Sequence, residues 1–377
     1  MKVLHLLCTI GISGAEKHLN FLLPGMSAYG YDCHLIIVHP IEYINDIIPL
    51  VNQLNQNNVK TALIDSKHAI SLKVLKGIKS YLIDNDIKII HSHLSKSDLL
   101  AVLLKQFFLK KLFIISTKHG YKETVLTEYD PANPKYKKNL FYYVTKYCLS
   151  KIDSNISISH CMSEFFISLN LSKEYFKVIH HGVDVDADDE ELLEFKDGVI
   201  NLVIVGRLEP YKGHKYVIEA MEIVFQHFPY INLLLLGGGS YKNVLQNLAE
   251  QKGIANNIKF LGFKPNALSY MKQAKLVIVP SLFEPFGLVF IEAIGLKKCV
   301  VAFDVPAGNE ILNKECAQLV PKKDISALAE KIIELIKNES KLRDLERKAF
   351  NVYNLNYTTS IMIKKTAEHY KSLILPE

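Results

Sequence analysis

Short apolar segments alternate with longer amphipathic segments along the whole chain. The predicted strands are residues 3–7, 35–38, 62–64, 87–90, 112–116 and 155–159 in the first half, and 200–205, 232–236, 258–261, 276–279 and 300–303 in the second. The segments between them have the apolar periodicity of helices. Continuous apolar strands separated by helices are typical of parallel sheets covered on both faces. The pattern predicts an α/β protein with two doubly wound, Rossmann-like domains that face each other across a cleft.

A polar stretch separates the two predicted domains. After Gly182 the chain turns acidic over residues 186–194 before the next strand begins. Such a stretch is typical of a linker between two hydrophobic cores. We expect an N-terminal domain over residues 1–182 and a C-terminal domain over 183–357. The remaining residues, 358–377, contain a helical segment that could pack on either domain.

Length and composition agree with two globular domains. The chain has 377 residues, of which 49% are hydrophobic and 22% charged, a composition that excludes a disordered protein. No apolar run reaches the roughly 18 residues of a membrane-spanning helix, and we interpret the apolar first segment as a buried strand rather than a signal peptide. Six scattered cysteines without a C-x-x-C pair indicate neither a disulfide framework nor a zinc site and fit a reducing cytoplasm.

The excess of positive charge lies in the first half. Residues 1–182 hold 21 lysines, no arginine and 14 acidic residues, a net charge of +7, so the remainder carries −1 of the total of +6. Lysines and aromatic residues are interleaved over residues 135–151. Two interpretations stay open for this segment: a solvated helix with its aromatic side against the core, and a helix that binds an anionic membrane surface. We expect no nucleic-acid partner, because no recognised binding motif accompanies the charge.

Two basic side chains follow a predicted strand of the second half. Arg207 and Lys212 lie five residues apart on a loop between Gly206 and Gly213, directly after strand 200–205. Ligands of open parallel sheets bind beyond the carboxyl ends of the strands, where an Arg fork and a Lys ammonium can converge on one anion. The loop indicates a pyrophosphate site, although charges on an ordinary surface turn would show the same pattern.

Two glutamates lie around the start of the helix predicted after strand 276–279. Glu284 precedes this helix and Glu292 lies inside it. Carboxylates accept hydrogen bonds from vicinal hydroxyls, and free N–H groups at a helix start can hold phosphate or sugar oxygens. The pair could therefore bind two diols. The alternative is a helix-start Glu favoured by the helix dipole together with an ordinary surface Glu.

Glycine turns and strand-end histidines give weaker signals. Gly11 and Gly14 open a helix after the first strand, but the sequence lacks the G-x-G-x-x-G pattern of a dinucleotide site. His119 lies at a strand end, where it could donate a hydrogen bond to a sugar hydroxyl or be structural. His91 and His93 share one strand face, but no third ligand is apparent, so we favour a cleft-lining or structural role over a metal site.

These motifs, in this order, resemble the GT-B glycosyltransferases, specifically the large retaining family 4. The matching segments are GISGAE at 11–16, IIHSH at 89–93, STKHG at 116–120, ISISH at 156–160, VIHHGVD at 178–184, VGRLEPYKG at 205–213, LLLLGGG at 233–239, IKFLGF at 258–263 and EPFGLVFIEA at 284–293. The two glutamates separated by seven residues, beside the Arg/Lys loop, are the specific part. One small departure is Ser13, where many members of the family have Gly.

The resemblance implies an enzyme, a retaining hexosyltransferase that moves a sugar from a nucleoside-diphosphate sugar to a glycan or lipid-linked acceptor in envelope polysaccharide biosynthesis. Among the possible donors, the resemblance favours a UDP-sugar. Arg207 and Lys212 would bind the donor pyrophosphate and neutralise the leaving diphosphate. Glu284 would orient the donor sugar, His119 would lie near the reacting sugar, and Glu292 would bind the ribose. The family needs no metal or other cofactor.

The resemblance also implies further donor contacts and the place of the last helix. The additional contact residues are Gly14 at the phosphate, the backbone of Phe286, Gly287 and Leu288 at the sugar, and Phe260 and Phe263 at the base. The helix within 358–377 would cross back to the N-terminal domain, which would bind the acceptor.

Other functions fit the same sequence. They are a non-catalytic subunit that binds a nucleotide-sugar, a nucleotide-sugar epimerase, and a nicotinamide dehydrogenase, which would lack its fingerprint. We expect a cytoplasmic protein, with peripheral association at the inner face of the membrane as an open alternative.

Overall fold

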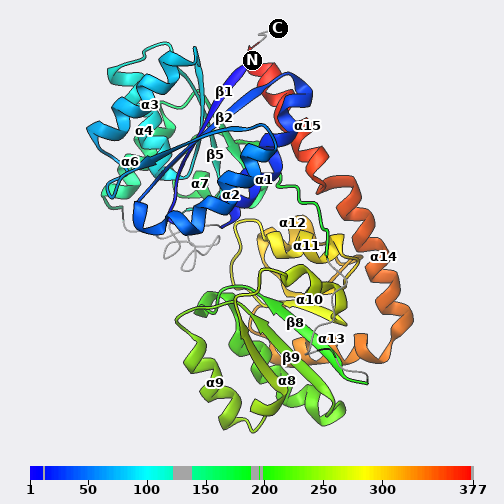
Figure 1. Ribbon diagram of the computed structural model, residues 1–377. Helices are drawn as coiled ribbons and strands as arrows, with labels where there is room; N and C mark the ends of the chain where they lie inside the picture. The colour runs from blue at the N-terminus through cyan, green and yellow to red at the C-terminus, as the bar shows by residue number, and fades with distance from the viewer. Residues whose placement is uncertain (12, 122–137, 188–194, 196–197, 375–377) are drawn as a thin grey trace. The chain divides into compact units, whose positions relative to one another are not determined.

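Two parallel sheets, one in each half of the chain, organise the structure (Figure 1). The computed structural model describes residues 1–11, 13–121, 138–187, 195 and 198–374. By its contacts the chain divides into two units, Met1–Gly182 with Thr359–Glu377, and Val183–Thr358. The predicted fold class, two doubly wound α/β domains, is confirmed.

The sheet of the first unit has seven strands in the order β3-β2-β1-β4-β5-β6-β7. The strands are β1 Lys2–Cys8, β2 Asp32–His39, β3 Lys60–Asp65, β4 Ile89–His93, β5 Phe113–Lys118, β6 Ser154–Ser157 and β7 Lys177–Val178. The order runs outward from β1 to one edge and from β4 to the other. The strand order therefore reverses between β1 and β4, and this is the place where doubly wound sheets bind ligands.

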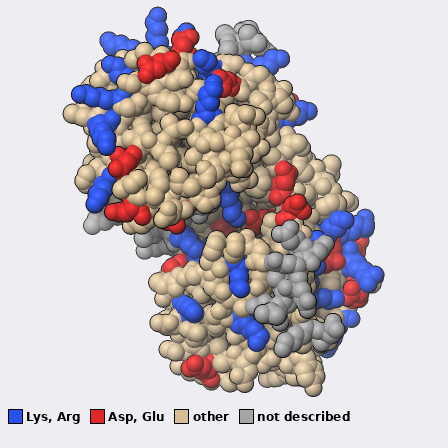
Figure 2. Space-filling view, viewed as in Figure 1, with Lys and Arg blue, Asp and Glu red and all other residues tan. Residues whose placement is uncertain are grey.

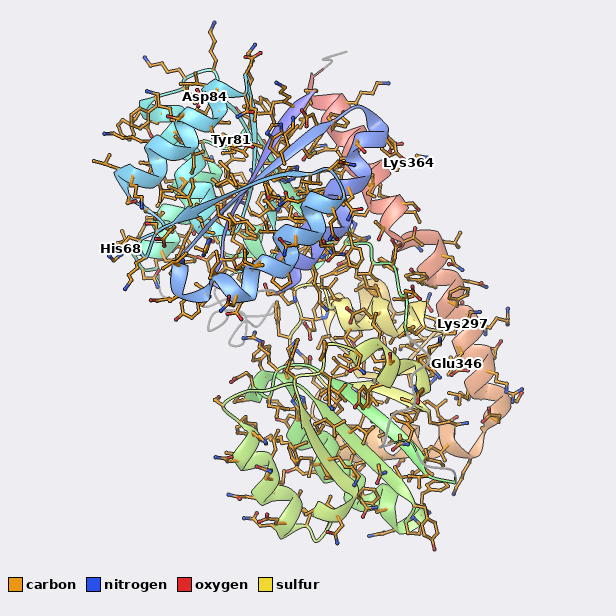
Figure 3. The ribbon with its side chains drawn as sticks, in the orientation of Figure 1. His68, Tyr81, Asp84, Lys297, Glu346 and Lys364 are labelled. Carbon is orange, nitrogen blue, oxygen red and sulfur yellow. The ribbon has the colours of Figure 1, made fainter. Side chains whose placement is uncertain are left out.

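Helices cover both faces of this sheet because successive side chains of a strand point to opposite faces. The helices are α1 Gly14–Met26, α2 Ile44–Gln56, α3 Leu72–Asp84, α4 Ser95–Phe107, α6 Leu140–Leu149, α7 His160–Ser168 and α15 Thr359–Ile374. Val3 and Leu7 of β1 pack with α1, α2 and α15, whereas Leu4 and Leu6 pack with α3, α4 and α6. Tyr81 of α3 adds a polar contact across the second face, since its hydroxyl lies 2.9 Å from Nδ1 of His34 (Figure 3).

The second unit repeats the plan with six strands in the order β10-β9-β8-β11-β12-β13. The strands are β8 Ile200–Val205, β9 Ile231–Leu236, β10 Ile258–Gly262, β11 Leu276–Val279, β12 Val300–Phe303 and β13 Gln318–Val320. The helices are α8 His214–His227, α9 Lys242–Gln251, α10 Ala267–Gln273, α11 Leu288–Gly295, α12 Pro306–Ile311, α13 Ile325–Lys337 and α14 Glu339–Asn356. Lys297, just after α11, lies over the ring of Phe350 on α14 (Figure 3). The strand order reverses here between β8 and β11.

Several elements go beyond the pattern read from the sequence. The strands β7 and β13 have two and three residues and give no periodic signal. The helix α14 is polar, and it buries a narrow stripe formed by Leu342, Leu345, Ala349 and Tyr353. Of the predicted basic segment, residues 135–137 lie outside the described residues, as do 188–194 of the linker.

All six cysteines are buried and none forms a disulfide. Within the described part of the chain, no helix combines the length and the apolar character that crossing a membrane requires.

Glycines let three loops of the second unit approach one another closely. A Cβ atom on Gly213 would lie 1.9 Å from the carbonyl oxygen of Pro280, and one on Gly237 would lie 2.0 Å from that of Gly206. Backbone hydrogen bonds join the same loops, from Leu208 N to Gly238 O at 2.8 Å and from Leu282 N to Tyr211 O at 2.8 Å. The loop after β8 is therefore held between the loops that follow β9 and β11.

Replacing Gly213 by alanine tests this close approach. Gly213 has a φ of +73°, so alanine adds the strain of a left-handed residue to the clash with Pro280. We expect Gly213→Ala to lower the free energy of unfolding by about 3 kcal/mol in urea titrations.

The matched control is Gly253→Ala. Gly253 has a similar φ of +69° but no atom within 4 Å of the added Cβ. This control should cost only about 1–2 kcal/mol. Equal losses in both variants would contradict a tight contact between the loops.

Candidate functional site

The loop after β8 presents two cations beside one tyrosine ring. Arg207 follows the strand almost directly, and its Nη2 donates a hydrogen bond to the Tyr211 hydroxyl at 2.5 Å. Lys212 ends the 3-10 turn Pro210–Lys212. The guanidinium and the ammonium lie 5.8 and 5.3 Å from the centre of the Tyr211 ring. The turn therefore brings both charges to one aromatic side chain, with Gly213 permitting the left-handed exit into α8.

Lys212 forms an ion pair with Glu284 from the neighbouring loop. Its Nζ lies 2.5 Å from Oε1 of Glu284, which also accepts a hydrogen bond from the Ser281 hydroxyl at 2.8 Å. Glu284 is only 8% exposed. A charge pair so far removed from water interacts strongly, and loss of either partner leaves a costly buried charge. The pair joins the carboxyl ends of β8 and β11, where the strand order reverses.

The helix α11 continues from the Glu284 loop. Gly287 has a φ of +98°, and a Cβ there would lie 2.4 Å from the Phe290 ring. The helix begins at Leu288, and the side chain of Phe286 is buried just before it. Glu292 lies in this helix and is 8% exposed, which is unlike an ordinary surface glutamate.

The structure places the two phenylalanines predicted at the base differently from each other. Phe260 lies in β10 and packs against the hydrophobic core of the unit. Phe263 follows the strand and is 82% exposed. Because β9 lies between β10 and β8, neither belongs to the pair of loops that carries Arg207, Lys212 and Glu284.

In the first unit, Gly14 opens α1 after a turn fixed by Glu16. The Ser13 backbone N–H and hydroxyl both donate to Oε2 of Glu16, at 2.8 and 2.6 Å. Glu16 is fully buried, and its Oε1 has no hydrogen-bond partner among the described residues. The glycine turn thus carries a helix-capping interaction that orients the start of α1.

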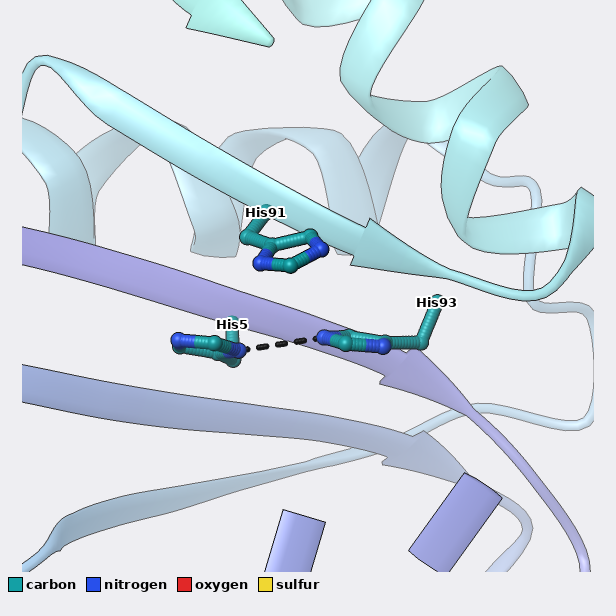
Figure 4. Close-up of side chains that lie close together, drawn as sticks. All are labelled: His5, His91 and His93. Atoms are coloured by element: carbon teal, nitrogen blue, oxygen red, sulfur yellow. Dashed lines mark hydrogen bonds between the residues drawn. The ribbon is translucent and has the colours of Figure 1, made fainter. Parts of the chain in front are cut away.

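His119 follows β5, is partly exposed, and joins an array of histidines that are otherwise buried. It lies 2.9 Å from His93 and 3.2 Å from His181, each distance between ring nitrogens. His93 in turn contacts His5 of β1 at 3.0 Å (Figure 4). Burial, followed by the neighbouring histidines, holds the pKa values of His93, His119 and His181 well below the ordinary value. These imidazoles are therefore neutral at physiological pH.

The opposite face of the same strands carries a buried ion pair. Nζ of Lys118 lies 2.6 Å from Oδ2 of Asp98, whose Oδ1 accepts hydrogen bonds from the hydroxyls of Ser92 and Ser116. Lys118 directly precedes His119. This network fixes the carboxyl ends of β4 and β5 and with them the backbone that presents His119 to the array.

The expectation that His91 and His93 lack a third histidine is wrong. The ligand atoms of His5, His91 and His93 lie within 4.8 Å of one another, as do those of His18, His93 and His119. Neutral imidazoles can bind metals. However, the rings of His5 and His93 stack at 15° and both nitrogens of His93 are already hydrogen-bonded, so a metal would have to break these contacts. The arrangement favours a hydrogen-bonded array.

Residues far apart in the sequence build this array, and most were missed. His5 pairs in register with His91 across β1 and β4, and Tyr370 reaches the array from α15. The sequence did contain one signal for His5. It lies two residues from Val3 and from Leu7 along the strand, so its side chain must share their buried face. Of the residues predicted from the sequence, the described structure joins Lys212 to Glu284 directly and Arg207 to Lys212 through Tyr211.

Two family models match adjoining parts of the chain. Glycosyltransferase Family 4 matches residues 12–187 and Glycosyl transferases group 1 matches residues 186–352. Among solved structures, HepE of Anabaena, in complex with UDP and glucose, has a TM-score of 0.81 at 19% identity and covers 99% of this chain and 100% of its own. This similarity supports the fold.

Curated relatives match with low identity. An uncharacterized glycosyltransferase of Methanocaldococcus jannaschii is 31% identical over 42% of this chain and 44% of its own length. A poly(glycerol-phosphate) alpha-glucosyltransferase of Bacillus subtilis is 24% identical over 85% of this chain and 49% of its own length. The chain thus covers less than half of these relatives. With both family models and the doubly wound fold in agreement, the chain belongs to the GT-B glycosyltransferases.

Proposed function

We propose that this protein is a retaining hexosyltransferase that moves a sugar from a UDP-sugar to a glycan or lipid-linked acceptor of an envelope polysaccharide. The observation that carries the proposal is the Lys212–Glu284 ion pair, with Arg207 beside it, at the carboxyl ends of β8 and β11. The UDP complex of HepE supports the choice of base. The name of the Bacillus subtilis relative supports a polymeric acceptor.

In this proposal, the two cations act on the leaving diphosphate. Glycosyl transfer passes through an oxocarbenium-like state while negative charge develops on the diphosphate. Arg207 and Lys212 stabilise that charge as it forms. Glu284 holds the Lys212 ammonium in place before the donor binds. The incoming pyrophosphate then competes with Glu284 for this ammonium. Glu284 then becomes available to accept hydrogen bonds from hydroxyls of the donor sugar.

The remaining donor contacts follow from the elements that adjoin this pair. Glu292 binds the ribose, and the backbone N–H groups of Phe286, Gly287 and Leu288 hold the sugar at the start of α11. Gly14 approaches the phosphate and His119 lies near the reacting sugar. The base lies beside Phe260 and Phe263. Basic side chains and helix dipoles carry the charge, so the reaction uses no metal.

Retention follows from same-face attack. The acceptor hydroxyl oxygen attacks the anomeric carbon on the side from which the diphosphate departs. The bond from that carbon to the phosphate oxygen breaks, and the hydroxyl proton passes to the departing oxygen. No carboxylate is assigned as a covalent nucleophile in this route.

Alanine at either cation tests the catalytic role. Because each cation stabilises charge that develops in the transition state, we expect Arg207→Ala and Lys212→Ala each to lower kcat/KM by about 10²- to 10³-fold. Lys252→Ala, which removes a surface partner of Glu222 in the same unit, should leave kcat/KM unchanged. Near-normal turnover in both site variants would defeat this role.

A donor screen tests the function itself. Thermal shifts with UDP-, GDP- and ADP-sugars should single out the UDP-sugars, because binding to the folded state raises Tm. Slow hydrolysis of the donor without acceptor would exclude a non-catalytic subunit. An epimer formed from the donor alone would instead support the epimerase.

A second proposal concerns an anionic membrane surface at α6. Tyr142 is buried, as the core interpretation expects, but Leu140 and Tyr143 are 79% and 58% exposed. Lys138 and Lys146 lie 5.7 and 6.0 Å from the centre of the Tyr142 ring. The helix thus exposes apolar side chains and carries two lysines beside its buried tyrosine, a combination suited to an anionic membrane surface. Figure 2 shows basic and acidic side chains intermixed on the visible face of the first unit.

Neutralising two lysines tests the membrane proposal. Each lysine near an anionic surface contributes about 1 kcal/mol, so Lys138→Gln with Lys146→Gln should weaken binding roughly thirtyfold. Flotation with vesicles containing phosphatidylglycerol at low salt measures it. Lys364→Gln, which changes an exposed lysine of α15 (Figure 3), is the control. Absence of flotation by the unaltered protein would remove the proposal.

A further inference from the structure

The hydroxyl of Tyr370 joins two arms of a hydrogen-bonded chain of buried rings. Tyr370 belongs to α15 and is fully buried. Its hydroxyl oxygen lies 2.5 Å from Nδ1 of His91 and 3.4 Å from Nε2 of His5. On the first arm, Nε2 of His91 continues to the Thr117 hydroxyl at 2.7 Å. Both arms therefore meet at a group that carries a single proton.

The second arm leads from Tyr370 to His119. Nδ1 of His5 lies 3.0 Å from Nε2 of His93 (Figure 4), and Nδ1 of His93 lies 2.9 Å from Nε2 of His119. Nδ1 of His119 then lies 3.2 Å from Nε2 of His181. Each of these imidazoles uses the same two nitrogens in the same sense. The hydrogen bonds of this arm must therefore all point the same way, either from Tyr370 toward His119 or from His119 toward Tyr370.

Proton counting leaves two self-consistent arrangements. A neutral imidazole has one N–H donor and one acceptor nitrogen. If Tyr370 donates to His91, then His91, His5, His93 and His119 all carry their proton on Nε2. If Tyr370 donates to His5, all four carry it on Nδ1. Burial lowers the pKa of His5 to about 3 and those of His91 and His93 well below the usual value, so the rings stay neutral.

The distances select the first arrangement. An O–H donor makes shorter hydrogen bonds than an N–H donor. The 2.5 Å contact to His91 fits donation by the Tyr370 hydroxyl, and the 3.4 Å contact fits a weak N–H from His5. His119 then carries its proton on Nε2 and presents the lone pair of Nδ1.

His119 is the end of the arm that a ligand can reach. It is partly exposed, whereas His5, His91 and His93 are buried. Its 3.2 Å contact with His181 is the longest between imidazoles along this arm. The ring of His18 also faces His119, at 5.1 Å between ring centres, whereas the neighbouring Lys118 is paired with Asp98 on the opposite face of the sheet. Neither is hydrogen-bonded to Nδ1 of His119 in the described structure.

We propose that Tyr370, His5 and His93 are positioning residues that hold His119 in its Nε2–H tautomer, so that Nδ1 accepts a hydrogen bond from a hydroxyl of the transferred sugar in place of the one from His181. The proposal rests on the proposed function. It reverses the direction of the hydrogen bond considered from the sequence, in which His119 could donate to the sugar.

Imidazole spectra test the tautomer without any donor. The full chain, labelled with ¹⁵N in its histidine rings, should show His5, His91, His93 and His119 all in the Nε2–H form, with assignments from single histidine replacements. A mixture of tautomers, or any of the four in the Nδ1–H form, would overturn the proposal.

Removing one hydroxyl tests the link to the reaction. Tyr370→Phe keeps the packed ring but removes the hydroxyl that hydrogen-bonds to both arms. We expect His5, His93 and His119 to lose their uniform tautomer and kcat to fall about tenfold with KM for the donor nearly unchanged, since the lost contact forms chiefly in the transition state.

Tyr31→Phe is the matched control. Its hydroxyl donates to the Ala367 carbonyl of the same helix α15 at 3.1 Å, and its ring packs on Tyr370, but it is not part of the chain. It should preserve both the tautomers and kcat. Equal effects of the two variants would reduce Tyr370 to a structural role.

The two readouts separate this proposal from the proposed function. If no sugar is transferred by the unaltered protein, the proposed function fails and the contact with the sugar falls with it, while the spectra still decide the tautomer. If transfer occurs but Tyr370→Phe retains normal kcat, the positioning role alone is overturned.

Discussion

The buried ion pair between Lys212 and Glu284 is the interaction on which the candidate site depends. It forms because β8 and β11 are neighbours although two strands separate them in the sequence. Parallel strands end at the same edge of a sheet, so the loops that follow these two strands must meet there. Glycine removes the side chains that would keep them apart, most clearly where Gly213 meets Pro280. Backbone geometry and charge pairing therefore support each other at this point.

The two units bring different chemistry to the same kind of sheet edge. The second unit concentrates cations and a carboxylate around Tyr211, which suits an anionic leaving group. The first unit places neutral imidazoles at the edge beside the switch between β1 and β4, and it confines its charged pair, Lys118 and Asp98, to the opposite face. Strand alternation alone separates these two networks, because His93 and Ser92 are consecutive residues that point to opposite faces.

The sequence predicted those features that depend on a local pattern of residues. Apolar alternation located the strands, and spacing placed Arg207 and Lys212 on one loop. The local pattern could not give the register between neighbouring strands. The approach of His5 to His91 was therefore missed, although both histidines are visible in the sequence. Nor could it show that Tyr370, 279 residues from His91, reaches the same array. The roles of Glu292, Phe260 and Phe263 stay predictions, since they concern a ligand rather than packing.

The neutral state of the histidine array also bears on donor binding. Under the proposed function, protonated rings would give the first unit positive charges of its own, which would favour a diphosphate over a neutral sugar hydroxyl. Burial lowers the pKa of His5 and of His18, to about 3 and about 4, and prevents this. The first unit can then offer hydrogen bonds of fixed direction without competing for the anion. Under the proposed function, the diphosphate is then bound by the loops after β8 and β11, while the proton order of the array, set by one tyrosine hydroxyl, determines how His119 hydrogen-bonds to a neutral sugar hydroxyl.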